Sequence, residues 1–123
     1  MKFTIDKQEK YVLIKLDEIK LDDIISPQLK TELERINSEG NRNIILDLSS
    51  IKESSDLSGL LLGTRICKDS NGLFVITGFS DKLSHLISIS KLENAFTIVP
   101  KVSEAIDLIY MEEIEREFDQ EPE

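Results

Sequence analysis

The chain has 123 residues, 40% of them hydrophobic, and a formal net charge of −9. This length and composition predict one domain with a modest hydrophobic core. Residues 112–123 hold seven acids and one arginine, which is −6 of the total and leaves −3 for the first 111 residues. No basic stripe is available for a phosphate backbone, so direct nucleic-acid binding is not expected.

Membrane and export signals are also lacking in the sequence. No apolar run approaches the roughly 20 residues that a membrane span needs, and the N-terminal MKFTIDKQEKY has no apolar core of a signal peptide. The lone cysteine, Cys67, rules out an internal disulfide and fits a reducing compartment. We therefore expect a soluble cytoplasmic protein without a membrane span.

The first third of the chain predicts a hairpin followed by a helix. Apolar and polar residues alternate on both sides of a polar stretch, residues 7–10, which is typical of two short strands and a tight turn. Ser26 and Pro27 then suit a helix start, because serine can cap a helix and proline fits its first position. Apolar residues recur at helical spacing until Gly40, which ends the helix.

Short apolar strands alternate with helices after Gly40. Strands are predicted at residues 43–48, 73–77 and 96–99, and helices from Leu57, over residues 80–91 and from Val102. This order predicts an α/β domain over residues 1–111, with a four- to five-stranded, mixed and mostly parallel sheet and helices packed against it. The 43–48 strand lacks polar alternation, so it should be central.

Residues 112–123 form a separate acidic segment. We expect residues 112–118 to extend the last helix, because Ile114 and Phe118 continue its hydrophobic stripe. The acidic run around Pro122 argues against order at the very end. The stripe through Tyr110, Ile114 and Phe118 would pack against this chain or against a second copy, which leaves a homodimer open.

Residues for catalysis or metal binding are scarce. His85 is the only histidine, and it lies in the middle of an ordinary amphipathic helix. One cysteine and one histidine do not make a zinc site, and Cys67 among leucines predicts a buried, inert thiol. No glycine-rich phosphate loop is present. We expect no enzyme activity, no cofactor and no metal.

The stretch KESSDLSGLLLG, residues 52–63, places three serines and an aspartate before a run of leucines. Such residues cap helices. A serine at a helix start can also be a switch, because phosphorylation adds about −1.5 to −2 charges. The helix N-terminus would accept that charge, whereas a partner surface shaped for a neutral hydroxyl would reject it.

Four stretches in order, NIILDLSSI, SSDLSGLLLG, NGLFVITGFS and LENAFTIVPKVSEAIDLI, resemble the STAS domain of sulfate transporters and anti-sigma-factor antagonists. The resemblance covers nearly all of residues 1–111, and the short chain is similar to the antagonist branch. It implies a partner, an anti-sigma factor that is also a serine kinase, whose binding would free a sigma factor and raise transcription. The kinase would supply ATP, so no cofactor is implied.

In that branch the first serine of a D-S-S-G-L motif at the helix start is phosphorylated, and two registers compete here. With ESSDL, residues 53–57, Glu53 replaces the aspartate, Ser54 takes the phosphorylated position and Asp56 replaces the glycine. With DLSGL, residues 56–60, Leu57 takes that position and the switch is lost. We prefer the first register, because a loop absorbs a two-residue shortening more readily than a packed helix.

The preferred register predicts Ser54 at or just before the helix start, with its hydroxyl open to solvent. Ser55 and Ser58 are the alternative phosphorylation sites. The residues expected to contact the partner are Glu53, Ser54, Ser55, Asp56 and Ser58. The second hypothesis is a degenerate STAS domain that is never phosphorylated and acts as a scaffold subunit of a signalling or lipid-transport complex. Glu53 and Asp56 favour it, since both place negative charge beside the site.

Overall fold

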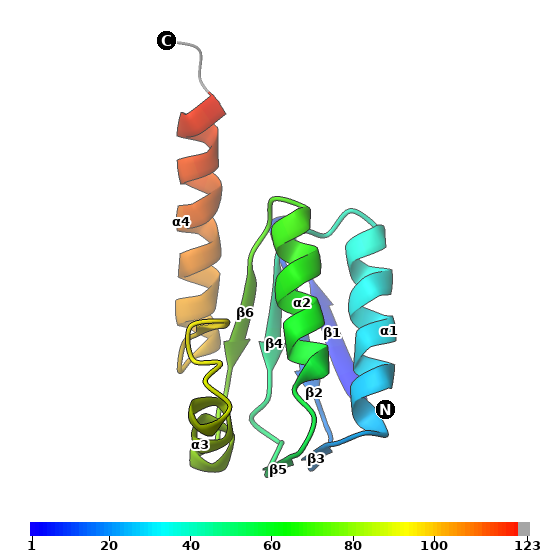
Figure 1. The fold of residues 1–123 in the computed structure, drawn as a ribbon. Helices are drawn as coiled ribbons and strands as arrows, with labels where there is room; N and C mark the ends of the chain where they lie inside the picture. Colours follow the sequence, from blue (N-terminus) through cyan, green and yellow to red (C-terminus); the bar gives the residue numbers. More distant parts are fainter. Residues whose placement is uncertain (121–123) are drawn as a thin grey trace.

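A five-stranded sheet forms the centre of the fold in the computed structural model, which describes residues 1–120 (Figure 1). The strand order is β1-β2-β4-β6-β7. The strands are β1 (Phe3–Lys7), β2 (Val12–Leu16), β4 (Ile44–Asp47), β6 (Phe74–Thr77) and β7 (Thr97–Ile98). Only the β1–β2 hairpin is antiparallel. The predicted mixed, mostly parallel α/β architecture and its N-terminal hairpin are confirmed.

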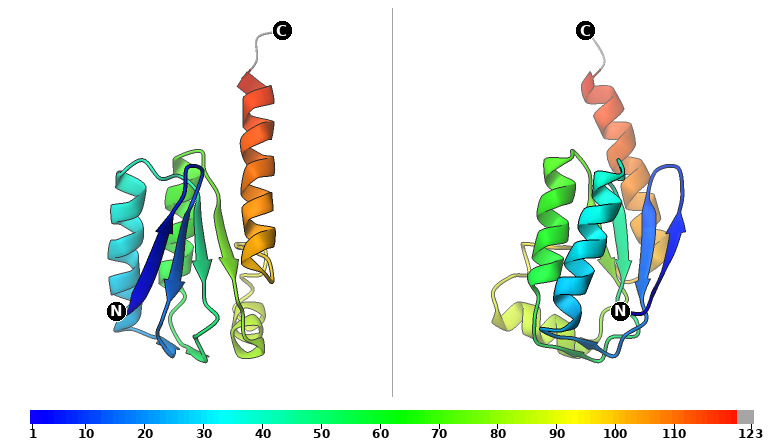
Figure 2. Two further views of the ribbon diagram at one scale, coloured as in Figure 1. Left: turned by 180° about the vertical axis from the view of Figure 1, so that it is seen from behind. Right: turned by 90° about the vertical axis from the view of Figure 1, so that its right-hand side faces the viewer.

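Helices cover both faces of the sheet (Figures 1 and 2). On one face lie α1 (Ile25–Ser38) and α2 (Ser58–Asp69), and on the other lies α4 (Val102–Gln120), while α3 (Asp81–Ile89) sits near the lower end in Figure 1. Strand β4 is the middle strand, and Ile44, Ile45 and Leu46 are all 0% exposed. Ile45 belongs to the α4 side of the core and its two neighbours to the α1–α2 side. The central position predicted for residues 43–48 is therefore confirmed, and two-sided burial explains the unbroken apolar run.

A small second sheet was not predicted. Strand β3 (Lys20–Leu21) pairs in parallel with β5 (Glu53–Ser54), two residues on each side. Two residues are too few to show the alternation that identifies a strand in a sequence. This pairing ties the segment before α1 to the segment before α2, at the lower end of the sheet in Figure 1.

The start of α1 differs from the prediction. Ser26 does not cap this helix: it lies inside it and is 0% exposed. Asp22 does the capping, because its Oδ1 accepts hydrogen bonds from the backbone N–H groups of Ile24 (3.1 Å) and Ile25 (3.0 Å). The Ser26 hydroxyl instead accepts a hydrogen bond from the N–H of Gly59, at the start of α2 (3.1 Å). Ser26 therefore makes a contact between two helices, which the local sequence could not predict.

Helix α4 continues through the 111/112 boundary without a break and ends at Gln120. Ala105 and Ile109 are buried against the sheet, whereas Ile114 is 52% and Phe118 is 68% exposed. Within residues 1–120, the hydrophobic stripe at the end of the helix therefore stays largely exposed. The prediction of disorder around Pro122 concerns residues 121–123, which lie outside the described part. Within residues 1–120, no helix is both long and apolar enough to cross a membrane.

The only cysteine is fully buried, as predicted. Cys67 lies on the inner side of α2 and is 0% exposed. Burial raises the pKa of its thiol to about 12. The thiol therefore stays protonated at neutral pH, which makes it a poor nucleophile.

A buried polar cluster joins α4 to the upper end of the sheet. The Asn43 amide donates hydrogen bonds to the carbonyl of Lys10 (2.9 Å) and to Glu113 Oε1 (2.7 Å), and its oxygen accepts one from the N–H of Leu73 (2.9 Å). Arg42 binds both oxygens of Glu113, at 3.1 and 2.6 Å, and Arg116 donates to Oε1 at 2.9 Å. Glu113, only 7% exposed, is thus fully paired.

We expect Asn43→Ala to lower the free energy of unfolding by about 2–3 kcal/mol, because the carbonyl of Lys10 and the N–H of Leu73 lose their partner and Glu113 loses one of its hydrogen bonds. Urea denaturation measures this change. The matched control is Asn94→Ala, at an exposed asparagine, which should change stability by less than about 0.5 kcal/mol. Equal losses in the two variants would show that Asn43 does not join the segments.

The same cluster predicts a pH dependence. Burial raises the pKa of Glu113, but hydrogen bonds from Arg42 and Asn43 and the charges of Arg42 and Arg116 outweigh it, so the pKa lies below its ordinary 4.5. Ionised Glu113 therefore stabilises the fold at pH values above its ordinary pKa. This contribution is lost as the pH falls through the lowered pKa of the folded state. Urea denaturation from about pH 7 to about pH 3.5 should show wild type losing its advantage over Glu113→Gln. A gap that stays constant across this range would contradict the expectation.

Candidate partner-binding site

The predicted serines lie in one segment at the lower end of the sheet, residues 53–58, which we call the serine loop. It follows β4, begins with β5 and ends at the first residue of α2. The carboxyl ends of the parallel strands and the starts of α1 and α2 meet at this end (Figures 1 and 2). Loops at this end of parallel sheets commonly carry binding residues, because the scaffold holds them in place.

Asp56 organises the start of α2. Its Oδ1 accepts hydrogen bonds from the N–H of Ser58 at 2.8 Å and from the hydroxyl of Ser58 at 2.5 Å. These bonds, the one from the hydroxyl first and the one from the N–H second, lower the pKa of the Asp56 carboxyl. A negative charge at this place is also favoured by the helix dipole. The aspartate therefore acts as the cap of α2 and stays ionised at neutral pH.

Ser58 is held between two helices. It is the first residue of α2, and its half-buried hydroxyl lies 3.2 Å from the hydroxyl of Ser26 in α1. The helices approach closely here because Gly59 has no side chain: a Cβ would lie 3.1 Å from Leu29 and 3.2 Å from the Ser26 hydroxyl. A phosphate on Ser58 would have to displace its bond to Asp56 and then face that carboxylate.

The structure contradicts the position and exposure expected for Ser54. This residue lies in β5, four positions before α2 begins, and its hydroxyl is buried without a hydrogen-bond partner among the described residues. Strand β5 pairs with β3, which matches Leu21 with Ser54 and lets the N–H of Ser55 donate to the carbonyl of Leu21 (2.9 Å). The segment is thus fastened to the sheet end and does not form the first turn of the helix.

The helix start bears on the register of the serine motif. Leu57 is the capping position of α2, and the helix runs for 12 residues from Ser58. A motif that opens the helix therefore coincides with DLSGL, residues 56–60, the register that we did not prefer. The preferred register assumed that a packed helix would not lose a turn. In the structure the helix begins only at Ser58, and residues 53–54 pair with β3 ahead of it.

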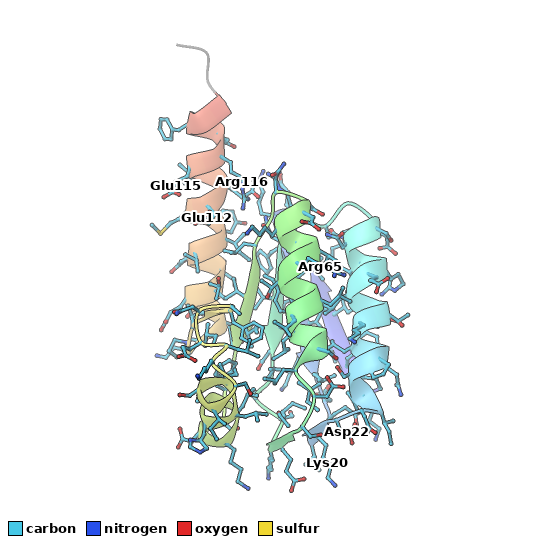
Figure 3. All side chains as sticks on the ribbon, viewed as in Figure 1. Lys20, Asp22, Arg65, Glu112, Glu115 and Arg116 are labelled. Carbon is cyan, nitrogen blue, oxygen red and sulfur yellow. The ribbon has the colours of Figure 1, made fainter. Side chains whose placement is uncertain are left out.

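Glu53 and Ser55 are the exposed members of the serine loop. The Glu53 carboxylate lies 3.8 Å from the Lys20 ammonium, with both side chains more than 60% exposed. A shallow hollow of about 200 Å³ lies beside them, lined by Lys20, Asp22, Glu53, Ser54 and Ser55. In Figure 3, Lys20 and Asp22 lie together at this end. The hollow offers hydroxyls and charges of both signs, which suits a polar contact with another protein.

Three of the five predicted contact residues, Glu53, Ser54 and Ser55, line this hollow, whereas Asp56 and Ser58 lie next to it at the start of α2. Sequence reasoning missed Lys20, Asp22 and Ser26, which come from the segment before α1 and from α1 itself. Asp22 carried a usable signal, since an aspartate just before an apolar helical pattern is typical of a cap.

In sequence comparisons, no family model and no curated protein matches the chain. Solved structures do. A proposed anti-sigma factor antagonist from Thermotoga maritima superposes with a TM-score of 0.78 at 20% identity, covering 88% of this chain and 94% of that one. An anti-sigma-factor antagonist (STAS) domain protein from Planctomyces limnophilus gives 0.78 at 11% identity, covering 88% and 97%. Phosphorylated Bacillus SpoIIAA gives 0.64 at 21% identity, covering 88% and 99%. The fold is that of STAS domains, as the motifs implied.

The capping role of Asp56 can be tested within one helix. Asp56→Ala should lower the free energy of unfolding by about 1 kcal/mol, because the N–H of Ser58 and the helix dipole lose their partner. The matched control is Asp69→Ala at the other end of α2, where an exposed acid faces the negative end of the dipole. That change should leave stability unchanged or raise it slightly, as read by urea denaturation. Destabilisation of equal size in both variants would rule out a cap at Asp56.

Proposed function

We propose that the protein is an anti-sigma-factor antagonist, a binding module without catalysis, and that it binds an anti-sigma factor that is also a serine kinase. Binding sequesters the anti-sigma factor, which frees a sigma factor and raises transcription indirectly. The observation that carries this proposal is the placement of the serine loop: it is fastened by β3 and the start of α2 at an exposed end of a fold shared with antagonists of this kind.

The contact surface in this proposal is the serine loop with the adjoining start of α1. Glu53 and Ser55 are exposed, while Asp56 and Ser58 are fixed by their mutual hydrogen bonds. Because the loop is already ordered, binding pays little conformational entropy for it. The first backbone N–H groups of α2 are already paired within the chain, so the exposed side chains of the loop would make the contact.

We propose further that phosphorylation of the serine loop abolishes binding. The three candidates differ in accessibility. Ser55 is exposed, the hydroxyl of Ser54 is buried, and the hydroxyl of Ser58 is hydrogen-bonded to Asp56. Accessibility therefore favours Ser55, one residue beyond the site that the sequence suggested. A phosphate there would join Glu53 and Asp56 in one negative patch and repel a partner built for a hydroxyl.

The test combines binding with site mapping. The purified chain is incubated with ATP and each anti-sigma kinase of its own genome, and phosphosites are read by mass spectrometry. Ser55→Ala should block modification while the dissociation constant changes less than about twofold, and Ser55→Asp should weaken binding at least about tenfold. Ser54 and Ser58 are changed in the same way. Ser38→Asp, at an exposed serine at the far end of α1, is the matched control and should bind as wild type.

A specific observation favours the second function, an unphosphorylated scaffold subunit of a signalling or lipid-transport complex. Leu57 occupies the capping position of α2, where the motif of the antagonists has its phosphorylated serine. If no serine of the loop is modified and the aspartate variants bind a partner as well as wild type, the switch is absent. The scaffold function then replaces the antagonist function. If no anti-sigma kinase binds the wild-type chain at all, the antagonist proposal fails as a whole.

A further inference from the structure

The outer side of α4 carries a line of exposed apolar side chains, which we call the α4 stripe. Its members are Tyr110 (43% exposed), Met111 (59%), Ile114 (52%) and Phe118 (68%). Spacings of three and four residues place them on one side of the helix. The opposite side packs on the sheet through Ala105 and Ile109. Large apolar side chains that gather on one exposed side commonly mark a binding surface.

The stripe lies where α4 projects from the domain. The carboxyl half of the helix extends past the upper end of the sheet, and no other element runs beside it (Figures 1 and 2). Glu113 and Arg116 hold this half to the body through Arg42 and Asn43, and Arg116 points inward while Glu115 points away (Figure 3). The Tyr110 ring meets Tyr11 edge-on at 6.5 Å, which fixes the end of the stripe nearest the body. Met111, Ile114 and Phe118 each keep more than half of their surface exposed.

Charges around the stripe decide what can cover it. Residues 102–120 contain seven acids and one base, Arg116, which is already paired with Glu113. Asp107, Glu115 and Glu117 are exposed around the stripe, and within the described chain they form no ion pair. A second copy would set one strongly negative helix against another, and nucleic acid or an anionic lipid surface would be repelled in the same way.

We propose that the α4 stripe binds a cationic amphipathic helix of a partner protein. The apolar face of that helix would cover Ile114 and Phe118, and its lysines or arginines would pair with Glu115 and Glu117. This surface lies at the opposite end of the domain from the serine loop (Figure 1). It is therefore independent of the proposed function, and both surfaces can be occupied at once.

The probe is a labelled synthetic helix of leucine and lysine, roughly 18 residues long so that it can form a helix. Its control has the same composition scrambled, so that leucines no longer share one face. Fluorescence anisotropy should show the amphipathic peptide binding wild type at least about tenfold more tightly than the scrambled one. Equal binding of the two peptides would show that only their charge is recognised, and this would overturn the proposal.

Variants locate the peptide on the chain. The double change Ile114→Ser with Phe118→Ser should weaken binding at least about tenfold, while Ile89→Ser, at an isoleucine of α3 that is 64% exposed, should change it less than about twofold. Glu115→Gln with Glu117→Gln should weaken binding and flatten its dependence on salt. In wild type, peptide binding should slow amide hydrogen exchange across residues 110–118, a readout that needs no variant.

Two further results would overturn the proposal. One is unchanged exchange across residues 110–118 in the presence of saturating peptide. The other is a wild-type dimer in sedimentation equilibrium that the Ile114→Ser, Phe118→Ser variant dissolves, because the occupant would then be a second copy. A monomer at micromolar concentration is the expected result. Variants of the serine loop should leave peptide binding unchanged, and this result distinguishes the α4 stripe from the serine loop.

Discussion

The buried amide of Asn43 is the interaction on which the upper half of the structure depends. At the amino end of the central strand, the chain must satisfy polar groups that no neighbouring strand reaches. Asn43 does this with one side chain, which joins the hairpin turn at Lys10, the start of β6 at Leu73 and helix α4 at Glu113. Strand register and helix placement are therefore set at one point, which is only 2% exposed. Such a network is stabilising because every member is paired.

The opposite end of the sheet is held together by a different device. There the starts of α1 and α2 are hydrogen-bonded to each other, because the Ser26 hydroxyl of α1 accepts a bond from the N–H of Gly59 in α2. Each helix start also has an aspartate cap, Asp22 for α1 and Asp56 for α2. Together with the β3–β5 pair, these contacts turn a loop rich in serine into a defined surface. The proposed contact residues are thus held by hydrogen bonds to the ends of the sheet and helices.

The fold could be predicted from the sequence because its largest elements have clear periodicity. The apolar run of β4 required burial on both faces, and the alternation of strands and helices fixed a mostly parallel sheet. The details of the site could not be predicted, since they depend on contacts between distant segments. Ser26 was predicted to cap its own helix but accepts a hydrogen bond from Gly59 of the neighbouring helix, and Ser54 lies in a two-residue strand with its hydroxyl buried. Asn43 gave no signal, because one polar residue before a strand is common.

Because the serine loop and the projecting end of α4 lie far apart, the effect of the protein should depend on its expression level. If the two proposed surfaces each bind a partner, the domain links the two partners, and tethering raises the effective concentration of each for the other. Assembly of such a ternary complex has an optimum: when the linker exceeds both partners, each partner is held on a separate copy and the bridge is lost. Cellular output would then fall at high expression of the chain, a response that an antagonist with one surface does not produce.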